Sequence, residues 1–213
     1  MSQLKCNVKF YLSSYRLGDQ AEKFAGLMPV GNKRIAIIPN AKDYEDEPEK
    51  RLEREAREMN ALKELGVEPE ILDLREFFGA QDLLKKKLSE VGGVWVLGGN
   101  TFVLRQAMRL SGFDSVITEL KNNQADFLYA GYSAGGCVLA PTLKGLNIVD
   151  DPNVKPYGDY PTIWEGLGLI DFSLAPHYQS NHPESAGVDQ EVEYMIANNI
   201  PYKTLRDGEV VIV

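Results

Sequence analysis

The sequence predicts an α/β protein, a three-layer α/β/α sandwich whose central sheet is mostly parallel. Short apolar runs alternate with amphipathic stretches along the chain, which is typical of strands joined by covering helices. The apolar runs are continuous, as expected for strands buried on both faces. Two of them end in glycine-rich turns. Ligands of such folds bind at the carboxyl ends of the strands, so we expect the functional site there.

The first half of the chain supplies three strand–helix units. The helix expected over 44–66 has one apolar face and a charged face that we interpret as solvated, and Gly66 is placed to end it. Apolar runs and helical spacing predict these elements in order: strands over 8–12, 34–39 and 70–74, and helices over 19–27, 44–66 and 81–91.

The second half contains both glycine-rich turns and one long loop. Residues 141–166 are rich in proline and glycine, and loops of such length in a compact domain often form site walls or lids. The elements expected around that loop are strands from 93 and from 127, helices over 100–110 and 114–121, a strand over 169–176, a helix over 188–198, and two strands over 202–205 and 209–213.

Composition sets limits on the function. The 213 residues, 44% hydrophobic and 25% charged, fit a single domain spanning 1–213. A net charge of -8 argues against a nucleic acid partner. Cys6 and Cys137 have neither disulfide nor metal-ligand spacing. The N-terminus has no apolar signal region and no run reaches a membrane span, so we expect no membrane association, a cytoplasmic location, and neither a metal nor another cofactor.

The stretch 127–140 is an apolar run, a glycine-flanked serine and a second apolar run that ends before Pro141. Its centre, Gly131-Tyr-Ser-Ala-Gly135, has the form of a nucleophile elbow, a sharp strand-to-helix turn that exposes the serine at the end of the strand. Glycines two residues before and after let strand and helix approach closely. The alternative is an ordinary tight turn in which Ser133 caps the helix.

An elbow brings a nucleophile and an oxyanion donor together. The amide of Ala134 would point to nearly the same place as the Ser133 hydroxyl. The turn after the strand at 93 exposes the amides of Gly98 and Gly99, which could supply a second donor or bind a phosphate. It lacks the continuation of a P-loop, and most such turns only pack a helix on a sheet.

An activated serine usually needs a neighbouring base, and the chain has two histidines. His177 follows an apolar strand and is expected at the same sheet end as Ser133, whereas His182 lies in a polar loop. A carboxylate should orient the imidazole. Asp150 and Asp151 on the long loop and Asp207 and Glu209 on the closing turn are candidates, and the sequence does not choose among them.

Together these motifs resemble the dipeptidase E and cyanophycinase family of serine peptidases. The resemblance rests on the segments Leu97-Gly-Gly-Asn-Thr-Phe102, Gly131-Tyr-Ser-Ala-Gly135 with Ala140-Pro-Thr142, and Ala175-Pro-His-Tyr178. It implies a fold like that of class I glutamine amidotransferases and a charge-relay hydrolysis of small peptides, with Ser133 as nucleophile and His177 as base.

The same resemblance offers two relay acids, of which we favour Asp207 because a turn at a strand end is firmer than a loop, while both are retained. Asp150 is similar to an aspartate proposed for dipeptidase E after a two-residue shift, and Asp207 stands where the family carries a glutamate. The resemblance to dipeptidase E implies cleavage of dipeptides that begin with aspartate, which requires a cation for the aspartate side chain. Residues 179–185 lack the family's basic, glycine-rich stretch.

Three other functions remain as alternatives. The chain could be a binding domain on the same fold in which no relay forms. It could be an amidotransferase-like enzyme with Cys137 as a thiol nucleophile, although a cysteine one turn beyond the elbow is more typical of a core position. An esterase of the α/β-hydrolase type needs more chain after Ser133 than is present.

Overall fold

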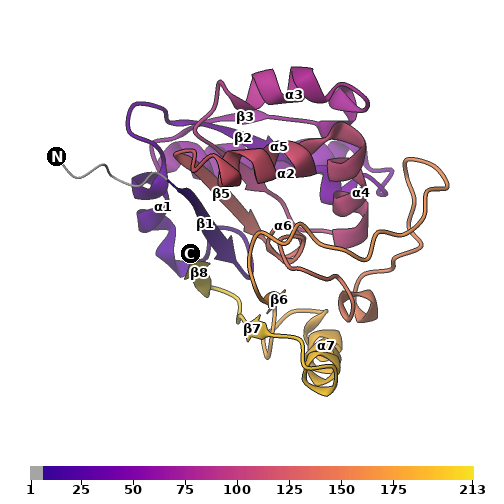
Figure 1. Ribbon diagram of the computed structural model, residues 1–213. Helices are drawn as coiled ribbons and strands as arrows, with labels where there is room; N and C mark the ends of the chain where they lie inside the picture. The colour runs from indigo at the N-terminus through magenta and orange to yellow at the C-terminus, as the bar shows by residue number, and fades with distance from the viewer. Residues whose placement is uncertain (1–6) are drawn as a thin grey trace.

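The computed structural model describes residues 7–213 and confirms the predicted fold class (Figure 1). A six-stranded sheet has the order β3-β2-β4-β5-β1-β8, with every neighbouring pair parallel except the antiparallel pair β1 and β8. Cys6 lies outside the described residues. The strands are β1 Val8–Ser13, β2 Arg34–Ile38, β3 Glu68–Ile71, β4 Gly93–Val96, β5 Phe127–Tyr132, β6 Ser173–Ala175, β7 Tyr202–Thr204 and β8 Val210–Ile212.

Helices cover both faces of this sheet (Figure 1). Alternate residues of the central strands enter two separate apolar cores, which is the expected result of a period of two along each strand. The α-helices are α1 Ala21–Leu27, α2 Pro48–Glu64, α3 Gln81–Leu88, α4 Thr101–Ser111, α5 Phe113–Asn122, α6 Ala134–Cys137 and α7 Ser185–Ala197; the 3-10 helices are η1 Gly18–Gln20, η2 Asn40–Lys42, η3 Leu74–Phe77 and η4 Leu146–Ile148.

One core contains side chains of α3, α4 and α5, including Phe113, and the other contains Phe24 of α1 and Leu62 of α2. Trp95 of β4 is fully buried in the second core and donates a hydrogen bond from its indole Nε1 to Glu58 of α2 at 3.1 Å. This bond gives the buried indole N–H an acceptor. Without one, the unpaired N–H group would destabilise the folded state. It also fixes the face that α2 turns toward the sheet.

Three predicted elements differ from the structure. The strand predicted over 70–74 is displaced, because β3 spans Glu68–Ile71 and Leu74 begins η3. The helix expected after Ser133 is only the single turn α6. The strand predicted over 169–176 is reduced to β6, which pairs in parallel with β7 in a separate two-stranded sheet below the main one (Figure 1). Since β8 pairs with β1, β7 and β8 do not form a hairpin with each other.

The long loop is held against the body of the protein at several points. Tyr157 donates its hydroxyl to Asp43 at 2.6 Å, and the Trp164 ring packs edge-on against Phe102 of α4. Asn100 donates from its side-chain amide to the backbone oxygen of Asp151 at 2.9 Å. The loop therefore has a defined course, and its first part reaches the carboxyl ends of β4 and β5.

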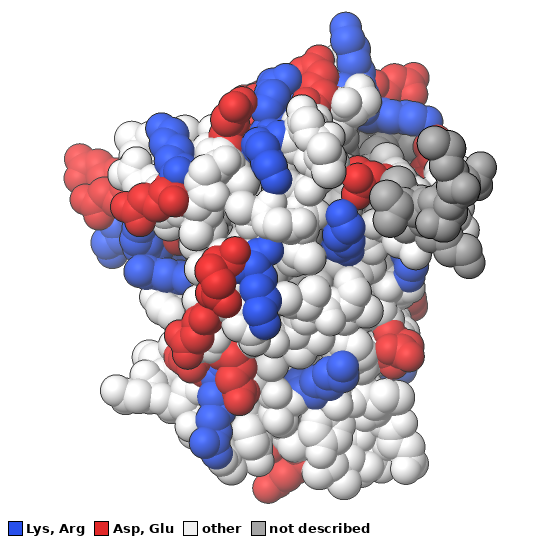
Figure 2. All heavy atoms as spheres, turned by 90° about the vertical axis from the view of Figure 1, so that its left-hand side faces the viewer, with Lys and Arg blue, Asp and Glu red and all other residues white. Residues whose placement is uncertain are grey.

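The charged groups on the face shown in Figure 2 are mixed, with acidic and basic side chains interspersed. Several charged side chains of the protein form ion pairs, for example Lys9 with Asp126 at 2.9 Å. No helix among residues 7–213 is long and apolar enough to cross a membrane.

Candidate active site

Ser133 occupies a nucleophile elbow between β5 and α6. Its backbone has φ 48° and ψ -121°, a conformation that L-residues rarely adopt. A Cβ on Gly131 would lie 2.8 Å from the backbone oxygen of Gly135, and one on Gly135 would clash with the backbone oxygen of Val96. Glycine is therefore required at both positions, for the close approach that the sequence pattern predicts.

The Ser133 side chain faces a cleft of about 330 Å³ at the carboxyl ends of the parallel strands. Within residues 7–213 its hydroxyl forms no hydrogen bond, so it is available to a ligand. The cleft is lined by Tyr15, Lys42, Tyr44, Arg54, Arg57, Gly98, Gly99, Tyr132, Ser133, Asp150, His177, His182 and Glu184.

His177 lies two residues after β6 and contributes its ring to the same cleft. Although β6 lies outside the main sheet, a positive φ of 61° turns the chain at His177. The His177 backbone N–H donates to the Ser14 hydroxyl at 2.8 Å, just after β1. This bond ties the histidine to the carboxyl end of the main sheet, where β5 presents Ser133.

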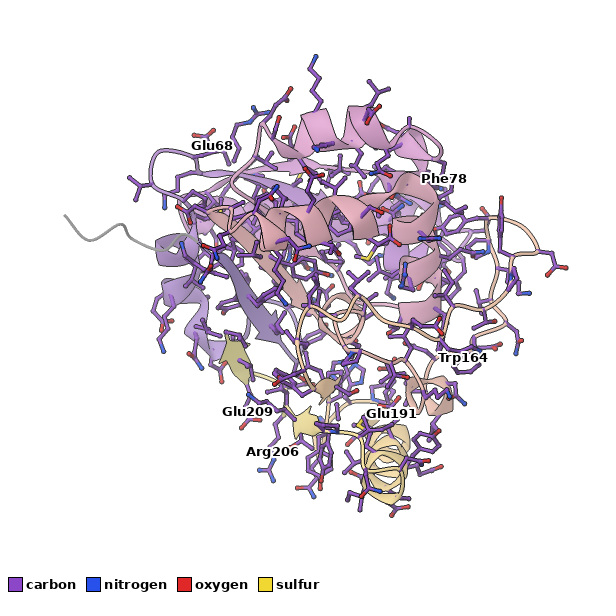
Figure 3. All side chains as sticks on the ribbon, viewed as in Figure 1. Glu68, Phe78, Trp164, Glu191, Arg206 and Glu209 are labelled. Carbon is purple, nitrogen blue, oxygen red and sulfur yellow. The ribbon has the colours of Figure 1, made fainter. Side chains whose placement is uncertain are left out.

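Asp207, and not Asp150, is the carboxylate bonded to the His177 ring. Its Oδ1 lies 2.6 Å from Nδ1 of the imidazole. The same oxygen accepts from the Ser14 hydroxyl at 2.9 Å, and the Asp207 amide donates to Ser180 at 2.8 Å. Arg206 and Glu209 flank this turn in Figure 3. With Nδ1 engaged by Asp207, the Nε2 nitrogen of His177 is left for the cleft.

Asp150 has a different partner. Its Oδ2 accepts a hydrogen bond from the Thr101 backbone N–H at 2.8 Å, at the N-terminus of α4. Burial raises the pKa of Asp150 to about 6, although the bonds from Thr101 oppose that rise. No hydrogen bond joins Asp150 to His177 among residues 7–213. It faces the cleft as a carboxylate that titrates close to neutral pH.

The three residues expected to form an oxyanion hole lie around Ser133. A Cβ on Gly98 would approach the Cβ of Ser133 to 3.1 Å, and Gly99 has φ 148°, which favours glycine. Burial raises the pKa of the neighbouring Tyr132 phenol. Ala134 opens α6, so its amide has no acceptor within the helix.

The sequence analysis missed three cations. Lys42 of η2 and Arg54 and Arg57 of α2 line the cleft, so the charged face of α2 is not simply solvated. Lys42 and Arg54 both pair with Glu45, at 2.9 Å and 2.7 Å. The spacing of Arg54 and Arg57, three residues apart on one helix face, was the available signal.

Arg57 is less fully paired than the other two cations. Within residues 7–213 its only hydrogen-bonding or ion-pair partner is Glu58, at 3.3 Å, and Glu58 also accepts from the Trp95 indole. The Arg57 side chain is 42% exposed. Of the three cations, it is the one with most capacity to bind an anion from solution.

A small cavity behind Ser133 is lined by three acidic side chains. Asp150, Glu184 and Glu191 line it together with Ser133 and Cys137. Glu191 is on the buried side of α7 (Figure 3). Burial raises its pKa to about 9, and the charges of Asp150 and Glu184 add to that rise. Glu191 is consequently uncharged at neutral pH.

Cys137 has the surroundings of a core residue. It is 3% exposed, at the end of α6, and its thiol lies 3.6 Å from the Leu174 backbone oxygen. Burial raises the pKa of the thiol well above its usual value. A thiolate is the reactive form of cysteine, so this position does not favour a thiol nucleophile.

Comparison with known proteins identifies the group to which these features belong. Residues 12–213 match the model of peptidase family S51. Peptidase E of Streptomyces coelicolor is 32% identical over 86% of this chain and 68% of its own, and an uncharacterized peptidase of Pasteurella multocida is 30% identical over 89% and 84%. Alignments with two Listeria peptidases cover 55% and 57% of those chains.

A solved structure shares the fold. A candidate Peptidase E protein from Listeria monocytogenes superposes with a TM-score of 0.72, at 23% identity, over 97% of this chain and 98% of that one.

Proposed function

This chain belongs to peptidase family S51, and from that premise we propose that it is a serine peptidase that cleaves small peptides with Ser133 as nucleophile. The observation that carries the proposal is the hydrogen-bonded pair His177 and Asp207, 2.6 Å apart, beside an elbow serine in one cleft. A carboxylate on Nδ1 holds the imidazole in the tautomer whose Nε2 can accept a proton.

The proposed reaction has two halves. The Ser133 hydroxyl attacks the peptide carbonyl carbon while His177 Nε2 takes its proton, and the resulting oxyanion accepts hydrogen bonds from the Ala134 amide and from Gly98 or Gly99. His177 then donates the proton to the leaving amine as the C–N bond breaks. Water, deprotonated by His177, releases the acyl group and restores Ser133. Asp207 stabilises the imidazolium in both halves.

The first experiment is intact-mass spectrometry after treatment with a fluorophosphonate probe. Wild type should gain one adduct on Ser133, whereas Ser133→Ala and His177→Ala should gain none although circular dichroism shows them folded. If folded wild type remains unlabelled, the protein is better described as a binding domain in which the relay does not operate.

The charges of the cleft support a small, doubly charged substrate. Arg57 offers a cation to a substrate carboxylate, and Asp150 offers an anion to an ammonium group. A peptide of two or a few residues carries both. We therefore include in the proposal that Arg57 binds a substrate carboxylate, either the C-terminus or an acidic side chain.

A dipeptide library tests this part. Arg57→Ala should raise KM about tenfold or more for peptides with an acidic residue, because a charge-assisted hydrogen bond is lost, and should alter kcat less. Comparison of Asp-X with Asn-X peptides tells which carboxylate Arg57 binds. The matched control is Arg109→Ala, an arginine on α4 that is 66% exposed and does not line the cleft. Equal effects of the two variants would contradict a role for Arg57.

A further inference from the structure

Three potential metal ligands meet at the mouth of the cleft. One donor atom each of His177, His182 and Glu184 lies within 4.8 Å of the others. Glu184 Oε2 is 3.9 Å from His177 Nε2 and 3.9 Å from His182 Nδ1. The His177 and His182 rings are stacked, with centroids 3.7 Å apart and an angle of 9° between their planes.

These separations are close to those of a zinc site. In a tetrahedral site with bonds of 2.0–2.1 Å, neighbouring donors are roughly 3.3 Å apart, so the two 3.9 Å distances need to shorten by roughly half an ångström. Two imidazoles and one carboxylate are also a typical set of three protein ligands with one open position.

The two outer ligands have room to make this adjustment. The side chains of His182 and Glu184 are 22% and 46% exposed, respectively. A parallel stack does not direct two in-plane nitrogen lone pairs at one point, so binding requires the His182 ring to turn away from the stack. The only hydrogen bond of the His182 side chain among the described residues is a long one, in which Nδ1 accepts from the Glu184 amide at 3.3 Å.

The third ligand is already oriented. Asp207 holds Nδ1 of His177 at 2.6 Å and is itself held by the Ser14 hydroxyl. A carboxylate on the far nitrogen of a metal-binding histidine fixes its ring and increases its basicity. Asp207, which would complete the relay, would thus also orient a ligand of the metal.

We propose that His177, His182 and Glu184 bind one divalent transition-metal ion of the zinc type, and that this ion inhibits the enzyme reversibly. The inhibition rests on the function proposed above. An ion bound to His177 Nε2 occupies the lone pair that would accept the proton of Ser133, so hydrolysis stops until the metal dissociates. Binding itself does not depend on that function.

Binding is measured first, without reference to activity. Equilibrium dialysis of the full chain against Zn²⁺ should give one ion per chain, and Co²⁺ should give the visible absorption of a low-symmetry site. His182→Ala and Glu184→Gln should each weaken zinc binding at least about tenfold, since each removes a ligand. The matched control is Glu193→Gln, an exposed glutamate on α7 outside the cluster, which should bind zinc as wild type does.

Two results would overturn the proposal. One is the absence of stoichiometric zinc binding at micromolar concentrations. The other is binding that is unchanged in both His182→Ala and Glu184→Gln, which would place the ion elsewhere.

Fluorophosphonate labelling then separates this proposal from the proposed function. Zinc should slow the labelling of wild type, and the slowing should be lost in Glu184→Gln and reversed by a chelator. A protein that binds zinc through His182 and Glu184 but is never labelled retains the metal site and loses the peptidase assignment. A labelled protein whose labelling rate is indifferent to saturating zinc loses the inhibition and retains the peptidase assignment.

Discussion

Asp43 and Asp73 meet arginines at the ends of β2 and β3, whereas within residues 7–213 Asp150 and Glu191 form no ion pair beside the cleft. Arg51 lies 2.6 Å from Asp43 and 2.9 Å from Asp73. Burial alone would raise the pKa of Asp73, but hydrogen bonds from Arg75 and Asn40 reverse the effect and lower it to about 2. The pKa of Asp150 is instead raised to about 6 and that of Glu191 to about 9.

The difference separates acids that hold the fold together from acids that do not. A buried carboxylate with charged and hydrogen-bonded partners contributes stability, while one without such partners costs stability. Costly groups of this kind are often found at functional sites. Asp43 also accepts a hydrogen bond from the Tyr157 hydroxyl, so the acids paired with arginines help to hold the long loop against the body of the protein.

The largest effect is expected from replacing the acid that assists His177 in catalysis. Asp207→Asn should reduce the rate of peptide hydrolysis about 1,000-fold or more, because the amide favours the wrong tautomer of His177. Asp150→Asn should reduce kcat less than about tenfold and act mainly on KM, because Asp150 bonds to Thr101 and lines the cleft rather than bonding to the imidazole. Steady-state kinetics of both variants, with folding checked by circular dichroism, measures the ratio.

If Asp150→Asn had the larger effect, an unpaired acid would be the one that assists His177, and the proposed relay would be wrong.

Removing Asp43 tests how much the acids paired with arginines stabilise the fold. Asp43→Ala should lower the free energy of unfolding by about 3 kcal/mol, because it leaves Arg51 partly unpaired and removes the anchor of Tyr157. Urea denaturation measures the change. Asp159→Ala is the control: Asp159 also pairs with a cation, Lys155 at 2.8 Å, but its side chain is 95% exposed, so no measurable change is expected.

Glu191→Gln tests how much the buried Glu191 carboxyl group, which forms no ion pair within residues 7–213, destabilises the folded state. Because the pKa of Glu191 is raised on folding, the folded state keeps a proton that the unfolded state releases, and wild-type stability falls as pH rises from about 4.5 toward 9. The stability of the glutamine variant does not fall in this way, because glutamine does not ionise. The variant should be more stable than wild type by at least about 2 kcal/mol at pH 8, where the full shift corresponds to about 5 kcal/mol, and equal to it near pH 4.

Urea denaturation across that pH range gives the difference directly. A difference between the two proteins that did not grow with pH would mean that Glu191 is ionised in the folded state.

The smallest effect is expected from Asp73→Asn. The pKa of Asp73 is lowered on folding, so its contribution is complete above about pH 4 and is lost as pH falls toward 2. The asparagine variant should lose about 1 to 2 kcal/mol at neutral pH, and its stability should decline less steeply than that of wild type below pH 4. Parallel declines in the two proteins would show that other carboxylates dominate acid unfolding.

Much of the main sheet could be predicted from local sequence because its strands are continuous apolar runs bounded by glycine and proline. The elbow at Ser133 follows from the spacing of Gly131 and Gly135, whose role is a short-range steric one. The two-stranded sheet of β6 and β7 could not be predicted in this way. Its pairing joins segments about thirty residues apart, and β7 is exposed and contains little apolar sequence.

The candidate site likewise has one part that local sequence predicts and another that it does not. The sequence by itself determined the nucleophile candidate and the base candidate, because an elbow pattern is local and the chain has few histidines. Only the tertiary structure showed that Asp207 and not Asp150 bonds to His177, brought Arg57 into the cleft, and stacked His182 on His177. Acids and arginines are common on surfaces, so their identity carries little information. Their role depends on which distant segments the packed sheet brings within hydrogen-bonding distance.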